Sequence, residues 1–167
     1  MQMASKKGIS ITVGILAAIT VGSFAIWMIP QNNQAIFSAS DFENHLDGVK
    51  AIHGTVNENL EEKFQNVIDG NLSPKEYIKM AETSSSQVNS QIIQLVESGA
   101  SKEWEQSYIE YIQALKQFNS YIRETIVSAN LIEDGKTGTE LDNAIEKANQ
   151  FKNDAMKTAK ASDAARP

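Results

Sequence analysis

The two histidines of the chain, His45 and His53, are the side chains best suited to metal or acid–base chemistry. Asp41 precedes His45 by four residues, so on a helix the two share a face and offer an oxygen and a nitrogen to a metal. His53 lies about 80° around such a helix from His45, which strains a three-ligand site. The Glu-x-x-His pairs of di-iron bundles are absent, because Phe42 and Lys50 stand three residues before the histidines. We therefore expect no metal and no cofactor, and Asp41, His45 and His53 remain only weak candidate metal ligands.

Two further groups of residues suggest binding. His53 and Ser85 fall on the inward stripes of two neighbouring predicted helices, where they form either a small polar ligand pocket or a structural hydrogen bond; we favour the second interpretation. Trp104, Tyr108 and Tyr111 have the composition of an aromatic site for a cation. Their heptad-like spacing is more typical of a hydrophobic core, so we expect them to be core residues.

Composition excludes several classes of function. The chain contains no cysteine, which rules out disulfides, thiolate metal sites and a cysteine nucleophile. Its net charge is −6, and Lys6 and Lys7 are its only charged residues before Asp41, so the rest carries −8 and is poorly suited to nucleic acid. The many carboxylates include no pair that stands out as a general acid and base, and no phosphate loop or nucleophile motif is present. We expect that the protein is not an enzyme.

These side chains lie in four stretches in which apolar residues recur every three or four positions, as on one face of a helix. The first is predicted at about 41–69, after a capping box formed by Ser40 and Glu43, and Gly70 follows it as a C-terminal cap. Its apolar stripe includes Ile52. The other three predicted helices cover 74–98, a stretch from a Ser101 cap to about Asp134, and a stretch from Thr139 to about 161.

Short connections between helices of this length favour antiparallel neighbours. The predicted fold is all-α, with an N-terminal single transmembrane helix (1–30), a linker (31–40), an up-down-up-down four-helix bundle (41–161) and a disordered tail (162–167). One span leading into a helical bundle is similar to the extracytoplasmic domains of chemoreceptors and sensor kinases. That resemblance covers the layout only and assigns no role to any residue.

Residues 8–29 contain no charged side chain and, as a helix, would extend about 33 Å, enough to cross the apolar core of a bilayer. Lys6 and Lys7 precede this stretch, and no charge follows it before Asp41. The asymmetry predicts a cytoplasmic N-terminus and an external C-terminal domain. The absence of cysteine from such an exported domain favours a bacterial or archaeal envelope. The alternative is a signal peptide cleaved near Ser23-Phe24-Ala25, but cleavage there would leave an apolar new N-terminus.

Small residues recur at every fourth position of the predicted span, at Ser10, Gly14, Ala18 and Gly22. Such a face lets two membrane helices approach closely. We therefore expect a protein partner or self-association. The function that fits best is an interaction or accessory subunit of a membrane complex, and the alternative is an extracytoplasmic ligand-binding sensor module that signals through a partner.

Overall fold

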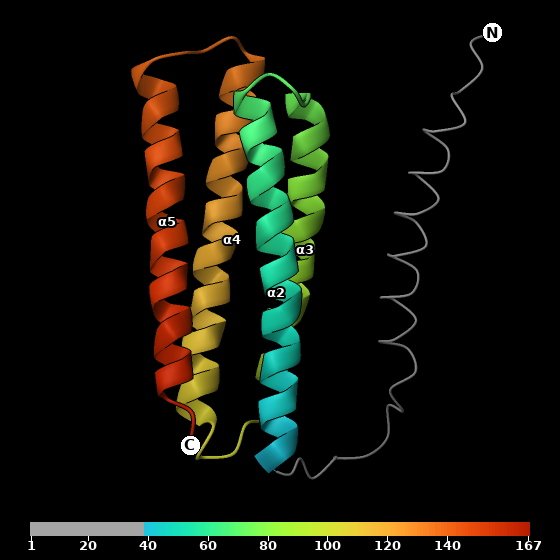
Figure 1. Cartoon of the computed structure of the whole chain (residues 1–167), viewed down its shortest axis with the longest axis vertical. Coiled ribbons are helices and arrows are strands. Elements are labelled where there is room, and N and C mark those ends of the chain that lie inside the picture. The colour runs from blue at the N-terminus through green and yellow to red at the C-terminus, as the bar shows by residue number, and fades with distance from the viewer. Residues whose placement is uncertain (1–38) are drawn as a thin grey trace, which may run out of the picture. The chain divides into compact units, whose positions relative to one another are not determined.

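The computed structural model describes residues 39–167, and this part of the chain is helical, with no strand among these residues. Figure 1 shows the helices joined by short connections. The four helices are α2 (Ala39–Ile68), α3 (Pro74–Glu97), α4 (Glu105–Glu133) and α5 (Thr139–Ala164). The four-helix bundle is thus confirmed for this part. The predicted membrane span and most of the linker lie outside the described residues.

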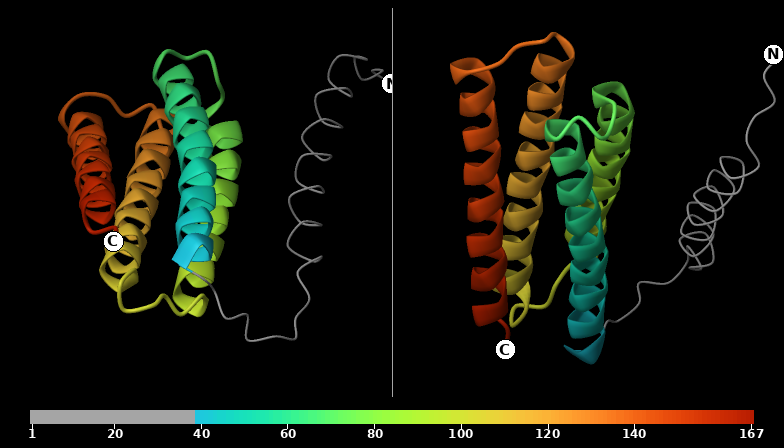
Figure 2. Two further views of the ribbon diagram at one scale, coloured as in Figure 1. Left: turned by 60° about the horizontal axis from the view of Figure 1, so that its bottom comes forward. Right: turned by 45° about the horizontal axis from the view of Figure 1, so that its top comes forward.

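Successive helices of the bundle run antiparallel. In Figures 1 and 2 the chain ascends along α2, returns along α3, ascends along α4 and returns along α5. The backbone of α4 packs against all three other helices. In contrast, no Cα atom of α2 lies within 8 Å of one in α5, so these two helices meet only through side chains.

Some helix ends have the cap that their sequence favours, and others do not. Gly70 adopts a φ of 72° after α2, and the N–H of Asn71 donates to the carbonyl of Asn66, which is the expected glycine cap. Pro74 stands at the start of α3, where its missing N–H costs nothing, but the Ser73 side chain makes no capping hydrogen bond. Ser101 does not cap α4. It begins a turn instead, and Trp104 takes the N-cap position.

The core lies between the inward stripes of the four helices and is richest along α4. Tyr111, Leu115, Phe118 and Ile122 of this helix are almost completely buried. The inner face of α5 is made largely of alanine; its buried alanines are Ala144, Ala148 and Ala155. Small side chains let the α5 backbone pack closely on α4.

Ile52 was expected in the inward stripe of the first helix, and this prediction is wrong. Its side chain is 51% exposed. Steps of four and three residues from Val49 lead to His53 and Val56, and Ile52 lies about 100° around the helix from His53. A histidine therefore occupies the inward position.

The C-terminal end also differs from the predicted disordered tail at 162–167. Helix α5 continues to Ala164, and Ser162 is fully buried. The Ser107 hydroxyl donates to the Ser162 carbonyl oxygen over 2.9 Å, and the Arg166 guanidinium pairs with Asp47 and Asp163. The contacts with Ser107 and Asp47 hold the end of the chain against α4 and α2.

Candidate functional site

His53 lies between α2 and α4 and is largely enclosed. Its Nδ1 atom is 2.8 Å from the Tyr111 hydroxyl, and its ring centroid is 4.4 Å from that of Phe118. Burial disfavours the charged imidazolium and lowers the pKa of His53 to about 4. His53 is therefore neutral at pH 7 and serves as a hydrogen-bonded part of the core.

His45 makes a similar contact with Tyr108, which lies one turn closer to the start of α4. The Tyr108 hydroxyl donates its only proton to the carbonyl oxygen of Phe42 over 2.9 Å. Its contact with His45 Nδ1 at 3.2 Å therefore requires the imidazole to donate. Burial lowers the pKa of His45 and raises that of Tyr108 to about 12. The pair fixes the first turns of α2 on α4.

The structure does not assemble the predicted metal ligands into one site. His45 and His53 direct their Nδ1 atoms to two different tyrosines, and Asp41 is exposed at the start of α2. Within residues 39–167 no group of three histidine, aspartate or glutamate side chains is placed to hold a metal ion. In this part of the chain the two histidines link helices.

Ser85 and His53 do not form a common pocket. The Ser85 hydroxyl donates to Asn119 Oδ1, and Asn119 Nδ2 donates to Asn89 Oδ1 over 2.7 Å. This amide cluster joins α3 to α4. The serine was recognisable from its place in the stripe, but Asn119 and Asn89 were missed, because their positions on adjacent helices become neighbours only in the folded bundle.

The aromatic residues Trp104, Tyr108 and Tyr111 are core residues, as predicted, and none is more than 4% exposed. Tyr77 extends this layer from α3. Its hydroxyl donates to Thr125 Oγ1 over 2.6 Å, and Thr125 donates to the carbonyl oxygen of Ile122. The buried phenols therefore anchor one helix to the next through hydrogen bonds.

Three buried polar atoms of the described residues have no hydrogen-bond partner, namely Gln91 Oε1, Trp104 Nε1 and Arg166 Nε, and the last of these lies 3.3 Å from Asp163 Oδ1 in an ion pair. The Gln91 side chain projects from α3 into the bundle and is only 4% exposed. An unpaired buried carbonyl costs free energy, and such atoms are often satisfied by a water molecule or a ligand. Among the described residues of α3, Gln91 carries a buried side-chain acceptor without a partner.

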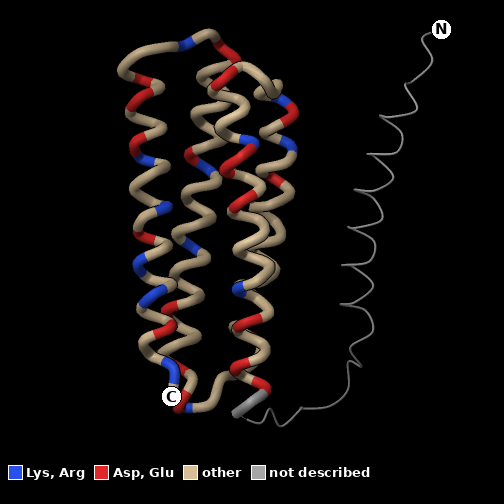
Figure 3. Tube along the Cα trace, viewed as in Figure 1, with Lys and Arg blue, Asp and Glu red and all other residues tan. Residues whose placement is uncertain are grey.

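The boundary between α2 and α5 is closed by ion pairs. Lys50 contacts Asp163, Lys152 contacts Glu61, and Arg166 contacts Asp47. Figure 3 shows charged positions along both helices. The hydrogen bond and positive charge of Arg166 lower the pKa of Asp47. Exposed pairs of this kind contribute little individually, but here they take the place of close backbone contact.

No protein-family model, no curated protein and no solved structure matches this chain. Among the described residues, none of the helices is long and apolar enough to cross a membrane. The predicted span at 8–29 is not among those residues.

Proposed function

We propose that this protein is a membrane-anchored helical bundle that acts as an interaction or accessory subunit of a membrane complex. The observation that carries this proposal is the stretch 8–29, which has no charge over 22 residues and is followed within ten residues by the first helix of the bundle. The proposed role involves no catalysis, cofactor or nucleic acid.

The proposed location of the bundle is outside the cytoplasm, with the N-terminus inside. Lys6 and Lys7 flank only the N-terminal side of the span. Because positive charge is retained on the cytoplasmic side, this asymmetry favours export of everything that follows the span.

The interior of the bundle supports a binding role over a catalytic one. His53, His45, Ser85 and Tyr77 each direct a polar atom at a partner on another helix. Groups held this way stabilise the bundle. Exposed apolar side chains remain on its outer surface, including Ile93, Val96 and Ile109. Exposed apolar groups that gather at one place are typical of a surface that contacts another protein.

A second candidate function is the binding of a small polar ligand by a sensor module. The observation that favours it is the unpaired carbonyl oxygen of buried Gln91. A ligand that donates a hydrogen bond there would raise the melting temperature of the parent protein. In Gln91→Leu, which removes the acceptor and keeps an apolar volume, the same ligand would lose its effect.

Topology is tested by adding protease to intact cells from which the wall has been removed. The bundle should be digested while a cytoplasmic control protein stays intact. Full protection of the bundle until the cells are lysed would refute the proposed location. Purification of the full chain from native membranes, followed by identification of co-purifying proteins, then tests the interaction role.

A further inference from the structure

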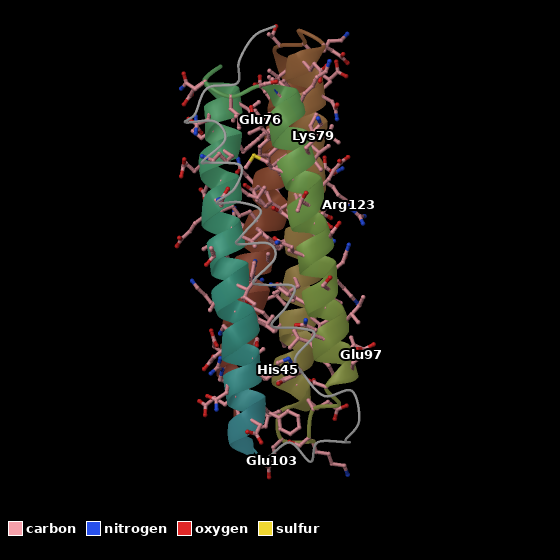
Figure 4. All side chains as sticks on the ribbon, turned by 90° about the vertical axis from the view of Figure 1, so that its right-hand side faces the viewer. His45, Glu76, Lys79, Glu97, Glu103 and Arg123 are labelled. Carbon is pink, nitrogen blue, oxygen red and sulfur yellow. The ribbon has the colours of Figure 1, made fainter. Side chains whose placement is uncertain are left out.

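One outer face of α3 carries no charge over most of its length. Between Glu82 and Glu97 the sequence has no charged residue, although 22% of the whole chain is charged. As a helix, residues 83–96 extend about 20 Å. Figure 4 shows Lys79 and Glu97 near the two ends of this stretch.

The exposed residues of this stretch include two large apolar side chains. Ile93 is 54% exposed and Val96 is 61% exposed. The contacts of Asn119 with Ser85 and Asn89 fix the register of α3 on α4, and this register places Ile109 of α4, 51% exposed, at the level of Val96. We call this set the α3 face; its exposed members are Thr83, Ser86, Asn89, Ser90, Ile93 and Val96 of α3, with Ile109 of α4.

The α3 face shares with the core of an interface its lack of charged residues. The centres of protein–protein interfaces are depleted of charged residues, whereas single exposed apolar residues are ordinary on any surface. Ile93 and Val96 lie within a charge-free stretch whose other exposed residues are Ser, Thr, Asn and Gln, and Ile109 lies level with its end. Solubility alone gives no reason to exclude charge from so long an exposed stretch.

We propose that the α3 face binds a second copy of this chain, with the two α3 helices parallel and related by a two-fold axis along the bundles. In such a contact each residue at the axis meets its own counterpart, so any charge there would meet a like charge. A different protein could supply complementary charges and would not require a neutral face. The absence of charge therefore favours a parallel second copy.

The position of Ile93, Val96 and Ile109 along the bundle also favours a parallel second copy as the partner. Tyr108 contacts Phe42 and His45, so the start of α2 lies level with the start of α4 and the end of α3. Ile93, Val96 and Ile109 are thus near the end of the bundle where the proposed anchor enters. Residues 30–39 extend at most about 30 Å. If two copies are anchored in one membrane, this end of each bundle is therefore held at a similar height above it, and the effective concentration of one copy near the other is high.

The parallel orientation rests on the proposed membrane anchor. The test uses the full chain in native membranes and exploits its lack of cysteine. Ser86→Cys and Ile93→Cys are oxidised as separate variants, and each should give a disulfide-linked dimer, because a residue near a parallel axis lies close to its own copy. Met156→Cys, exposed on α5, a helix whose backbone does not contact α3, is the matched control and should stay monomeric.

A second set of variants tests the charge argument. Ser90→Glu, placed between the two reporter positions, should abolish most of the dimer formed by Ile93→Cys, whereas Met156→Glu on α5 should leave it unchanged. If Ser86→Cys and Ile93→Cys give no dimer alone but cross-link when the two variants are co-expressed, the helices are antiparallel and the proposal is wrong. Equal cross-linking of all three cysteine variants reflects random collision and also overturns it.

Alkaline extraction of the same membranes separates this proposal from the proposed anchor. A chain that stays in the membrane but gives no specific dimer leaves the anchor in place and refutes dimerisation through the α3 face. Extraction of the chain by alkali would refute the proposed membrane anchor. If the extracted chain still gives the specific cross-links at Ser86→Cys and Ile93→Cys, the α3 contact stands without it.

Discussion

The Nδ1 atom of His53 lies 2.8 Å from the hydroxyl of Tyr111, and this hydrogen bond joins the middle of α2 to α4. The imidazole also packs on Phe118. A proton added to His53 would place a charge in this largely apolar layer. The stability of the bundle should therefore depend on the protonation state of this residue.

Acid should destabilise the bundle through His53. The pKa of His53 is about 4 in the folded protein, below its usual 6.5, so between these values the unfolded chain binds a proton that the native state does not. Stability is fully present above about pH 6.5 and is lost as the pH falls toward 4, by roughly 3 kcal/mol at most. Urea melts at several pH values measure this loss.

The control for acid destabilisation is His53→Gln, which cannot ionise. Carboxylates and His45 titrate in both proteins, so the difference between the two stability curves isolates His53. The measurements use the segment from Phe37 onward, which forms a compact unit. If the free energies of unfolding of the parent and of His53→Gln change in parallel from pH 7 to 4.5, His53 takes up a proton in the folded bundle as readily as in the unfolded chain, and the prediction is wrong.

Truncation of Phe118 should be among the most damaging single changes. Its side chain is 1% exposed and contacts the rings of His53 and Tyr121. Replacing a buried Phe by Ala costs roughly 3–5 kcal/mol, because a cavity remains. Denaturant melts of Phe118→Ala and of Val127→Ala, an exposed position on the same helix, provide the comparison. A loss below about 1 kcal/mol for Phe118→Ala would show that the inward face of α4 is assigned wrongly.

Removal of residues 162–167 should lower stability, although this segment has the composition of a frayed tail. The truncation removes the hydrogen bonds of Ser162 with Ser107 and the Arg166 pairs with α2. A buried Ser107 hydroxyl without a partner costs about 1–3 kcal/mol. Ser107→Ala removes the unpaired hydroxyl, so it should recover part of the loss in the truncated protein. Identical melting of the truncated and complete bundles would contradict the contacts of the C-terminal segment.

Self-association through the predicted membrane span should depend on its small residues. Gly14→Ile and Gly22→Ile fill the face formed by Ser10, Gly14, Ala18 and Gly22 while the span stays apolar. Both changes should lower the signal in a membrane two-hybrid assay, whereas Ile15→Leu on another face should not. Equal signals from all variants and the parent would mean that the span only tethers the bundle.

The sequence alone determined the helical fold and most of the core. Apolar residues at steps of three and four define an inward stripe without knowledge of the partner helix, and Gly70 marks a helix end through its own backbone freedom. For the same local reason the spacing of Trp104, Tyr108 and Tyr111 was enough to predict core residues. These features depend on interactions within a few residues.

Only the tertiary structure decided which polar groups meet. His53 and Tyr111 are 58 positions apart, and their contact depends on the exact register of α2 on α4. The same holds for Asn119 with Asn89, for Ser107 with Ser162 and for the ion pairs that bridge α2 and α5. A shift of one helical turn would keep every apolar stripe inward but change each of these partners. Periodicity therefore fixes which face is buried, whereas packing of whole helices fixes the hydrogen bonds between them.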